Sequence, residues 1–147
     1  MPRTALVVPV AEASPYYDLG NGVPAHITVV FPFAEEPDEQ AVRELVSRFR
    51  AFDFTLDRIE QFETGTRWLH PSPSAAFVDL TEAFVERWPE HPPYDGQFDE
   101  VIPHLTITVQ DVPLPITARA TEVALLVEDE ATGRWSTRAS FPLQGVA

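Results

Sequence analysis

Two copies of the tripeptide His-x-Thr are the residues of this sequence best suited to chemistry. They are His26-Ile27-Thr28 and His104-Leu105-Thr106, and they hold two of the four histidines of the chain. On a β-strand, residues i and i+2 point to the same side, about 6.6 Å apart along the chain. Each motif therefore predicts an imidazole and a hydroxyl on one face of a strand, with the middle residue behind them in the core.

Such a pair of motifs suits displacement at phosphorus if the two strands lie side by side. One neutral imidazole removes a proton from the attacking oxygen, and one imidazolium protonates the leaving oxygen. The hydroxyls of Thr28 and Thr106 hydrogen-bond the phosphoryl oxygens, where negative charge must be stabilised. Because the ordinary pKa of His is about 6.5, both protonation states are available near neutral pH. This scheme needs no metal and no cofactor.

A metal site is the alternative chemistry for two histidines. Catalytic zinc takes about three protein ligands from His, Cys and carboxylates. The sequence holds no Cys, and no carboxylate stands at a ligand spacing such as His-Glu-x-x-His. We therefore expect no metal ligands. The other two histidines, His70 and His91, each precede a proline, and we expect both in solvent-exposed loops.

Aromatic and basic residues near the motifs are further candidates for substrate contact. Phe33 and Tyr94 lie in predicted loops close to the motifs, and we expect both to contact the substrate. Trp135 could also stack on a base, although large aromatic residues mostly fill the core. Arg67 and Arg134 could hold a phosphate, but Arg on an acidic protein is usually solvated and paired.

Hydrophobic patterning places both motifs on strands. Apolar β-branched runs and alternating patterns predict strands over 4–10, 25–31, 52–62, 101–109, 122–128 and 134–143. Amphipathic helices are predicted over 38–51, after an N-cap at Asp38, and over 74–88. Because strands and helices interleave without a regular βαβ repeat, the pattern favours an α+β domain.

A weak internal repeat accompanies the motifs. Residues 25–30 (AHITVV) resemble residues 103–108 (PHLTIT), and residues 54–62 loosely resemble residues 116–124. The simplest account is two related strand units, the second of which lacks the helix of the first. For residues 54–62 and 116–124, chance accounts for the similarity equally well.

Length and charge limit the class of protein. The chain of 147 residues suits one domain with a single core, and its 10 basic residues against 23 acidic ones give a net charge of -13. This charge argues against a surface for long nucleic acid, but not against a pocket for one phosphate. No apolar run approaches the 18 residues of a membrane span. We expect a monomeric cytoplasmic protein with no membrane partner. The absence of Cys fits a reducing compartment.

The paired motifs resemble those of the 2H phosphoesterase superfamily, in particular the bacterial proteins called 2'-5' RNA ligase-like. Members carry two H-x-[S/T]-hydrophobic motifs on strands of two similar lobes, and HITV and HLTI match this pattern in full. The resemblance spans roughly residues 1–143. It implies a single domain over 1–147, built of two pseudo-symmetric antiparallel β-sheet lobes that flank a central cleft, with the helices on the outer faces.

The resemblance also implies an activity. It implies a cyclic phosphodiesterase that opens a 2',3'-cyclic nucleotide or a related small cyclic phosphate, with His26 and His104 as acid and base in either order. Thr28 and Thr106 are then the phosphate ligands. Because the chain is small and acidic, we expect a nucleotide or a short RNA end rather than long RNA. Two alternatives stay open, namely a catalytically silent nucleotide or RNA-end binding module, and 2'-5' RNA ligase activity.

Overall fold

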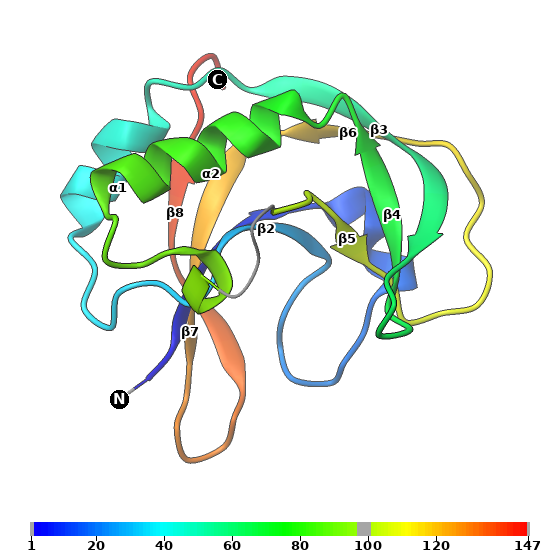
Figure 1. Ribbon diagram of the computed structural model, residues 1–147, viewed down its shortest axis with the longest axis horizontal. Coiled ribbons are helices and arrows are strands. Elements are labelled where there is room, and N and C mark those ends of the chain that lie inside the picture. Colours follow the sequence, from blue (N-terminus) through cyan, green and yellow to red (C-terminus); the bar gives the residue numbers. More distant parts are fainter. Residues whose placement is uncertain (1, 97–100, 147) are drawn as a thin grey trace.

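Two four-stranded antiparallel sheets make up the computed structural model, which describes residues 2–96 and 101–146. The first sheet has the order β2-β1-β7-β8 and consists of β1 (Thr4–Pro9), β2 (His26–Val30), β7 (Glu122–Glu128) and β8 (Trp135–Pro142). The second has the order β5-β4-β3-β6 and consists of β3 (Phe52–Gln61), β4 (Arg67–Ser72), β5 (Leu105–Thr106) and β6 (Ile116–Ala120). The edge strands β2 and β5 meet in the middle of the molecule (Figure 1). The α+β class and the two-lobed architecture predicted from the sequence are confirmed.

Two α-helices cover the faces of the sheets that lie away from the motif side chains. Helix α1 (Glu39–Val46) begins after Asp38, whose side chain accepts a hydrogen bond from the Ala41 amide at 3.1 Å. Helix α2 (Ala75–Arg87) buries Phe77 and Phe84 against both sheets, in one continuous apolar core. The described residues also form two short turns, the 3₁₀ turn η1 (Ala11–Tyr16) and η2 (Pro93–Gly96), which contains left-handed residues. Neither helix of the described chain is long and apolar enough to span a membrane.

The two sheets are built on one plan. Strands β2 and β5 occupy corresponding outer positions, and β1 and β4 are the corresponding inner neighbours. The stronger repeat in the sequence, 25–30 with 103–108, therefore marks equivalent strands. The weaker match pairs β3 with residues of β6 and the start of β7, although the positional counterpart of β3 is β7. That second match is a chance resemblance.

Strand β6 is absent from the sequence-based prediction, and so is β4. Trp68 and Leu69 are both buried, so the strand shows no apolar–polar alternation, and Pro71 argues against a strand because it has no amide hydrogen. A bulge in β3 between Leu56 and Ile59 accommodates Pro71. His70 therefore lies on a strand and is half-buried, and His91 is half-buried against Phe33. The prediction of an exposed loop is therefore wrong for His70, and for His91 the loop is confirmed but the full exposure is not.

The predicted strand over 101–109 is much shorter in the structure. Only Leu105 and Thr106 form β5, so His104 stands immediately before a strand rather than within one. Pro103 lacks an amide hydrogen, and the Thr108 amide donates to the carbonyl of Tyr16 in η1, at 2.9 Å, instead of to a strand. Helix α1 is likewise shorter than the predicted 38–51.

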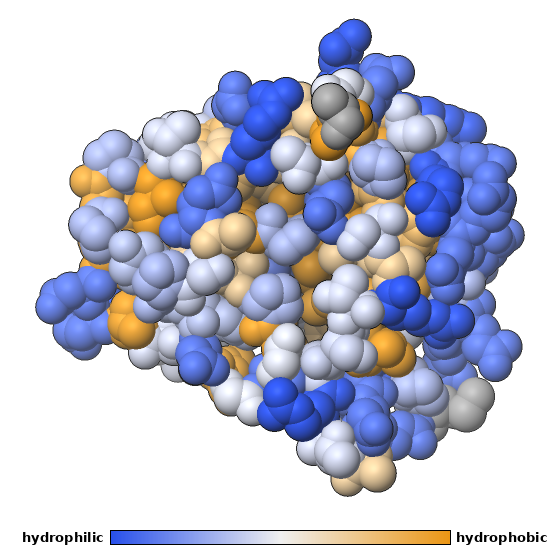
Figure 2. Space-filling model, turned by 180° about the vertical axis from the view of Figure 1, so that it is seen from behind, coloured by the Kyte–Doolittle hydropathy of each residue, from blue (hydrophilic) through white to orange (hydrophobic). Residues whose placement is uncertain are grey.

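Polar and apolar side chains divide the surface unevenly. Figure 2 shows one face, on which hydrophilic residues crowd the right-hand and lower margins and apolar residues lie in the middle and on the left. Over the whole chain, acidic residues outnumber basic ones by 23 to 10, which gives a net charge of -13. A bound anion therefore depends on local hydrogen-bond donors rather than on the field of the whole molecule.

Candidate active site

Each motif histidine is held by the same local hydrogen bond. Nδ1 of His26 lies 2.7 Å from the carbonyl oxygen of Pro24, and Nδ1 of His104 lies 2.7 Å from that of Ile102. A carbonyl oxygen only accepts, so Nδ1 carries the hydrogen in both rings. Nε2 is therefore the nitrogen of each ring that gains or loses a proton.

The surroundings of the two rings favour the neutral imidazole. Burial lowers the pKa of His26 and of His104 below the ordinary value of 6.5, and the hydrogen bonds to the two carbonyls oppose this effect. A positive charge on His104 lowers the pKa of His26 further. The two motifs thus lie close enough to interact electrostatically, and the state with one charged and one neutral ring is favoured over the doubly charged state.

Aromatic side chains fix both rings. The ring of Tyr17 packs edge-on against His26 with a centroid distance of 5.6 Å. Phe62 and Trp68 pack in the same way against His104, at 5.1 and 5.9 Å. These three residues are not predicted from the sequence, because they come from the end of η1, the β3–β4 turn and the unpredicted β4. No local pattern relates them to the motifs.

The segment before the first motif is tied to the segment after the second. The Thr108 amide donates to the Tyr16 carbonyl at 2.9 Å, and the Asp18 amide donates to the Thr108 hydroxyl at 2.8 Å. Because Tyr17 stands between these two anchors, the residue that packs against His26 is positioned by the lobe that carries His104.

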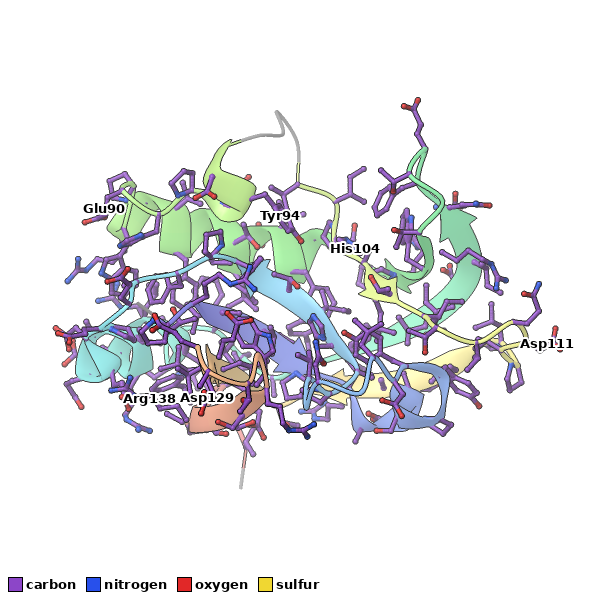
Figure 3. All side chains as sticks on the ribbon, turned by 90° about the horizontal axis from the view of Figure 1, so that it is seen from below. Glu90, Tyr94, His104, Asp111, Asp129 and Arg138 are labelled. Atoms are coloured by element: carbon purple, nitrogen blue, oxygen red, sulfur yellow. The ribbon has the colours of Figure 1, made fainter. Side chains whose placement is uncertain are left out.

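Two cavities open beside the motifs. The His104 cavity, of about 420 Å³, is lined by Phe62, Glu63, Thr64, Tyr94, Val101, Ile102 and His104. The His26 cavity, of about 230 Å³, is lined by Arg3, Ala5, Val7, Tyr17, Val23, His26, Thr28, Phe31, Leu126 and Trp135. Figure 3 shows Tyr94 and His104 as close neighbours across the first of these cavities.

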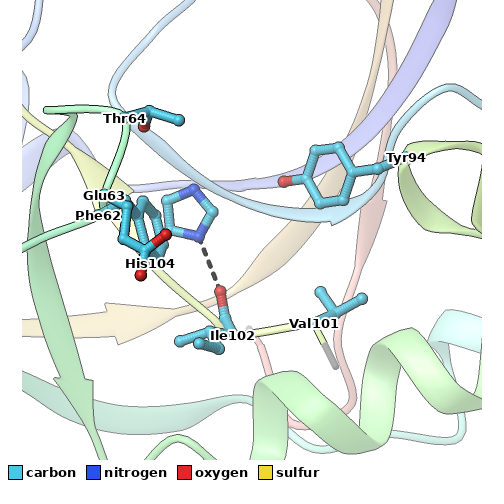
Figure 4. Close-up of a pocket in the computed structure, with 7 residues that line it drawn as sticks. All are labelled: Phe62, Glu63, Thr64, Tyr94, Val101, Ile102 and His104. Atoms are coloured by element: carbon cyan, nitrogen blue, oxygen red, sulfur yellow. Dashed lines mark hydrogen bonds between the residues drawn. The ribbon is translucent and has the colours of Figure 1, made fainter. Parts of the chain in front are cut away.

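Tyr94 connects the two cavities. It lines the His104 cavity, where its hydroxyl points toward the imidazole (Figure 4), and the same hydroxyl is hydrogen-bonded with the side chain of Thr28. Burial raises the pKa of Tyr94, so the phenol keeps its proton at neutral pH. Its backbone is left-handed, with φ 53° and ψ 35°, and Asp95 follows with φ 55°. Two consecutive non-glycine residues in this left-handed conformation are strained, and strain of this kind is often found at functional sites.

The structure separates the other sequence candidates. Phe33 is only 5% exposed and packs against Phe84 and Trp88 beneath α2, so it contacts neither cavity. The expectation that Phe33 touches the substrate is therefore abandoned. Trp135 does line the His26 cavity. Thr106 is half-buried opposite Trp68, on the same face of the second sheet.

The two candidate arginines serve the backbone. Arg67 donates to the carbonyls of Val109 and Gln110, at 3.2 and 3.1 Å, and so holds the loop after β5. Arg134 donates to the Gly20 carbonyl at 3.2 Å.

Arg3 brings positive charge to the His26 cavity. It lies over the rings of Phe31 and Trp135, at 5.5 and 5.8 Å, and makes a two-pronged ion pair with Glu128 at 2.9 and 2.8 Å.

Across residues 2–96 and 101–146, no group of three or more His, Cys, Asp or Glu side chains is arranged to hold a metal ion.

Comparisons with known proteins give a consistent family and fold. Residues 2–143 match the model of the 2'-5' RNA ligase superfamily. Escherichia coli LigT complexed with 3'-AMP superposes with a TM-score of 0.65 at 19% identity, over 97% of this chain and 99% of that one. TT0787 of Thermus thermophilus gives 0.62 at 18% identity, over 99% and 100%. A further structure, of a phosphoesterase, gives 0.63 at 18% identity, over 98% and 99%. A search of curated proteins gives no significant match.

Proposed function

The chain belongs to the 2'-5' RNA ligase superfamily of 2H phosphoesterases, and from this premise we propose that it hydrolyses a small cyclic phosphodiester. The substrate class is a 2',3'-cyclic nucleotide or a related cyclic phosphate. The observation that carries the proposal is the identical anchoring of His26 and His104, each with Nδ1–H on a carbonyl at 2.7 Å. Two imidazoles with a free Nε2, close enough to interact, supply one base and one acid.

The reaction is a displacement at phosphorus. The neutral imidazole takes a proton from water through Nε2 while the water oxygen forms a bond to phosphorus. The bond from phosphorus to one ring oxygen breaks, and the imidazolium donates its proton to that oxygen. The product is a phosphomonoester, and the two rings have exchanged protonation states. This scheme needs one imidazolium and one neutral imidazole, and a positive charge on His104 favours that state because it lowers the pKa of His26.

Hydroxyl groups stabilise the phosphoryl oxygens in this scheme. Thr28 lines the His26 cavity, and Thr106 stands two residues after His104. Tyr94 adds a third hydroxyl, which reaches Thr28 from the His104 cavity. Hydrogen-bond donors that are in place before the reaction lower the barrier, because no reorganisation is needed as charge develops. The scheme uses no metal ion.

The nucleotide class of the substrate is supported by relatives of the same fold. LigT of Escherichia coli has been crystallised with 3'-AMP, with NADP+, with ATP and with phosphate. A nucleoside 3'-phosphate is one of the two products that opening of a 2',3'-cyclic phosphate gives. The cavities of about 420 and 230 Å³ beside the two motifs are of a size that suits one nucleotide.

The test is turnover of a panel of 2',3'-cyclic nucleotides by the wild type, His26→Ala and His104→Ala, with and without EDTA. We expect each substitution to lower kcat/KM by about 10²-fold or more, because general acid–base catalysis contributes on that scale. EDTA should leave the wild-type rate unchanged. His91→Ala is the matched control, since His91 packs against Phe33 away from both cavities.

Each other outcome has its own meaning. Full rate in either motif variant contradicts the acid–base assignment, and loss of activity in EDTA with recovery in zinc identifies a metal enzyme. Saturable nucleotide binding without product identifies the binding module. Joining of RNA ends in a 2'-5' linkage identifies the ligase, in which a 5'-hydroxyl takes the place of water.

A further inference from the structure

A third histidine lies next to the second motif. Strands β4 and β5 pair Trp68 with Thr106 and Leu69 with Leu105, so the register, continued by one residue, sets His70 across from His104. Residues paired in this way share one face of a sheet. The ring of Trp68 contacts both imidazoles, with centroids 6.3 Å from His70 and 5.9 Å from His104.

Asp57 holds this histidine in one orientation. Asp57 lies in the bulge of β3 between Leu56 and Ile59, and its Oδ1 is 3.1 Å from Nδ1 of His70. A carboxylate only accepts, so Nδ1 carries the hydrogen and Nε2 is the ring nitrogen left for a ligand. The His70 side chain is 22% exposed, so a ligand can reach it.

The fold itself does not require a titratable residue at this position. The corresponding residue of the first sheet, across from His26, is Pro9. The remaining lining from that sheet includes Ala5, Val7 and Leu126. At this position the first sheet therefore offers no side-chain hydrogen-bonding group, whereas the second sheet carries an imidazole with its own carboxylate. A difference of this kind between two otherwise equivalent sheets indicates a role in binding.

The same wall holds an unmet hydrogen-bond donor. Trp68 is 6% exposed, and its Nε1 has no hydrogen-bond partner among the described residues. Buried donors without a partner are rare in proteins, because each one costs the solvation of its N–H group. Because this N–H is closed off from solvent, Nε2 of the partly exposed His70 is the polar atom of this wall that a ligand can reach.

We propose that His70, oriented by Asp57, binds a second phosphate group of the substrate, beside the phosphoryl group that reacts between His26 and His104. In the bound state Nδ1–H donates to Asp57 and Nε2–H donates to a phosphate oxygen, so the imidazolium makes charge-assisted hydrogen bonds to an anion on each side. The inference rests on the proposed function. It narrows the substrate to a nucleotide that carries a phosphate in addition to the cyclic one.

The test compares adenosine 2',3'-cyclic phosphate with and without a 5'-phosphate. We expect the wild type to prefer the 5'-phosphorylated substrate by about 10-fold in kcat/KM, the scale of one charge-assisted hydrogen bond. His70→Gln and Asp57→Asn should bring this ratio close to 1 while they leave kcat/KM for the unphosphorylated substrate within about 2-fold. His91→Gln is the control and should keep the preference.

A binding measurement separates this inference from the proposed function. Calorimetry with adenosine 3'-phosphate and adenosine 3',5'-bisphosphate requires no turnover. The wild type should bind the bisphosphate about 10-fold more tightly, and His70→Gln should bind both equally. If the protein shows this difference in affinity but hydrolyses no cyclic nucleotide, the proposed function is refuted and the assignment of His70 stands. Equal affinities in the wild type, or an undiminished difference in both His70→Gln and Asp57→Asn, overturn the assignment of His70.

Discussion

At the scale of single residues, the site consists of two histidines in the same local setting. Each ring donates Nδ1–H to the carbonyl two residues earlier, at 2.7 Å. Each ring is also packed edge-on by an aromatic side chain. Neither ring is distinguished by its anchor, so in the proposed reaction the orientation of the bound ester decides which one acts as the base.

The first prediction concerns the pH dependence of catalysis. Burial lowers the pKa of both imidazoles below 6.5, and kcat/KM reports the free enzyme. We expect a bell-shaped profile of kcat/KM whose centre lies below pH 6.5, measured from about pH 5 to about pH 8 on one cyclic nucleotide. A maximum on the alkaline side of neutrality would contradict the pair as the acid and base.

The second prediction concerns the Tyr94 hydroxyl. Tyr94→Phe removes the hydrogen bond with Thr28 and leaves the ring in the His104 cavity. We expect kcat to fall by roughly 3- to 10-fold with little change in KM, since one uncharged hydrogen bond is worth about 0.5–1.5 kcal/mol. The limbs of the pH profile should not move, because the phenol stays protonated. Tyr16→Phe, outside both cavities, should behave as wild type, and equal kcat in both variants would exclude this role.

At the scale of elements, the outer edge of β2 is held by helix α2 and turn η2. The Thr81 hydroxyl of α2 donates to the Val29 carbonyl at 2.9 Å, and the Tyr94 amide donates to the Phe31 carbonyl at 2.6 Å. An edge strand has carbonyls that no other strand pairs. These two contacts therefore fix the strand that carries the first motif.

The third prediction follows from the Thr81 contact. Thr81 is 9% exposed, so Thr81→Val leaves the Val29 carbonyl without its partner in a dry environment. We expect a loss of about 1–3 kcal/mol in the free energy of unfolding, measured by urea denaturation. Thr117→Val, at an exposed position of β6, should change stability by less than about 0.5 kcal/mol. Equal effects in the two variants would contradict the role of Thr81.

The sequence predicts those elements whose pattern is local. The strands of the first sheet, β3 and both helices have clear periodicity, and the two motifs repeat within short segments. Strand β4 has no such pattern, because Trp68 packs in the site while Leu69 packs in the core. Tyr17 packs against His26 only because hydrogen bonds between distant segments place it there. His70 lies beside His104 only through the pairing of β4 with β5. Phe33 fails as a candidate because the chain turns under α2 at that point.

At the scale of the whole molecule, the two lobes share one apolar core. Residues from both sheets and both helices belong to the same buried cluster. The first sheet combines residues 4–30 with residues 122–142, so neither end of the chain forms a sheet alone. We therefore infer a single domain, which unfolds in one cooperative transition.

The fourth prediction concerns stability against pH. The unfolded chain binds protons on His26 and His104 with a pKa near 6.5, whereas the folded chain binds them only at lower pH. This contribution to stability is complete above pH 6.5 and is lost as the pH falls from 6.5 through the folded values. Urea unfolding at about pH 8 and about pH 5 should show a smaller decline for the double variant His26→Asn with His104→Asn than for the wild type. An equal decline in both proteins would refute this linkage.

The positions of the strands along the chain determine the order in which the two sheets can be completed during translation. Residues 52–120 supply every strand of the second sheet, whereas β1 pairs with β2 and β7, which are made early and late. The half with His104 is therefore complete in the nascent chain while β1 still waits for its inner partner. Translation must pass residue 142 before the lobe of His26 is complete, so the histidine that is synthesised first is the last to acquire its finished sheet.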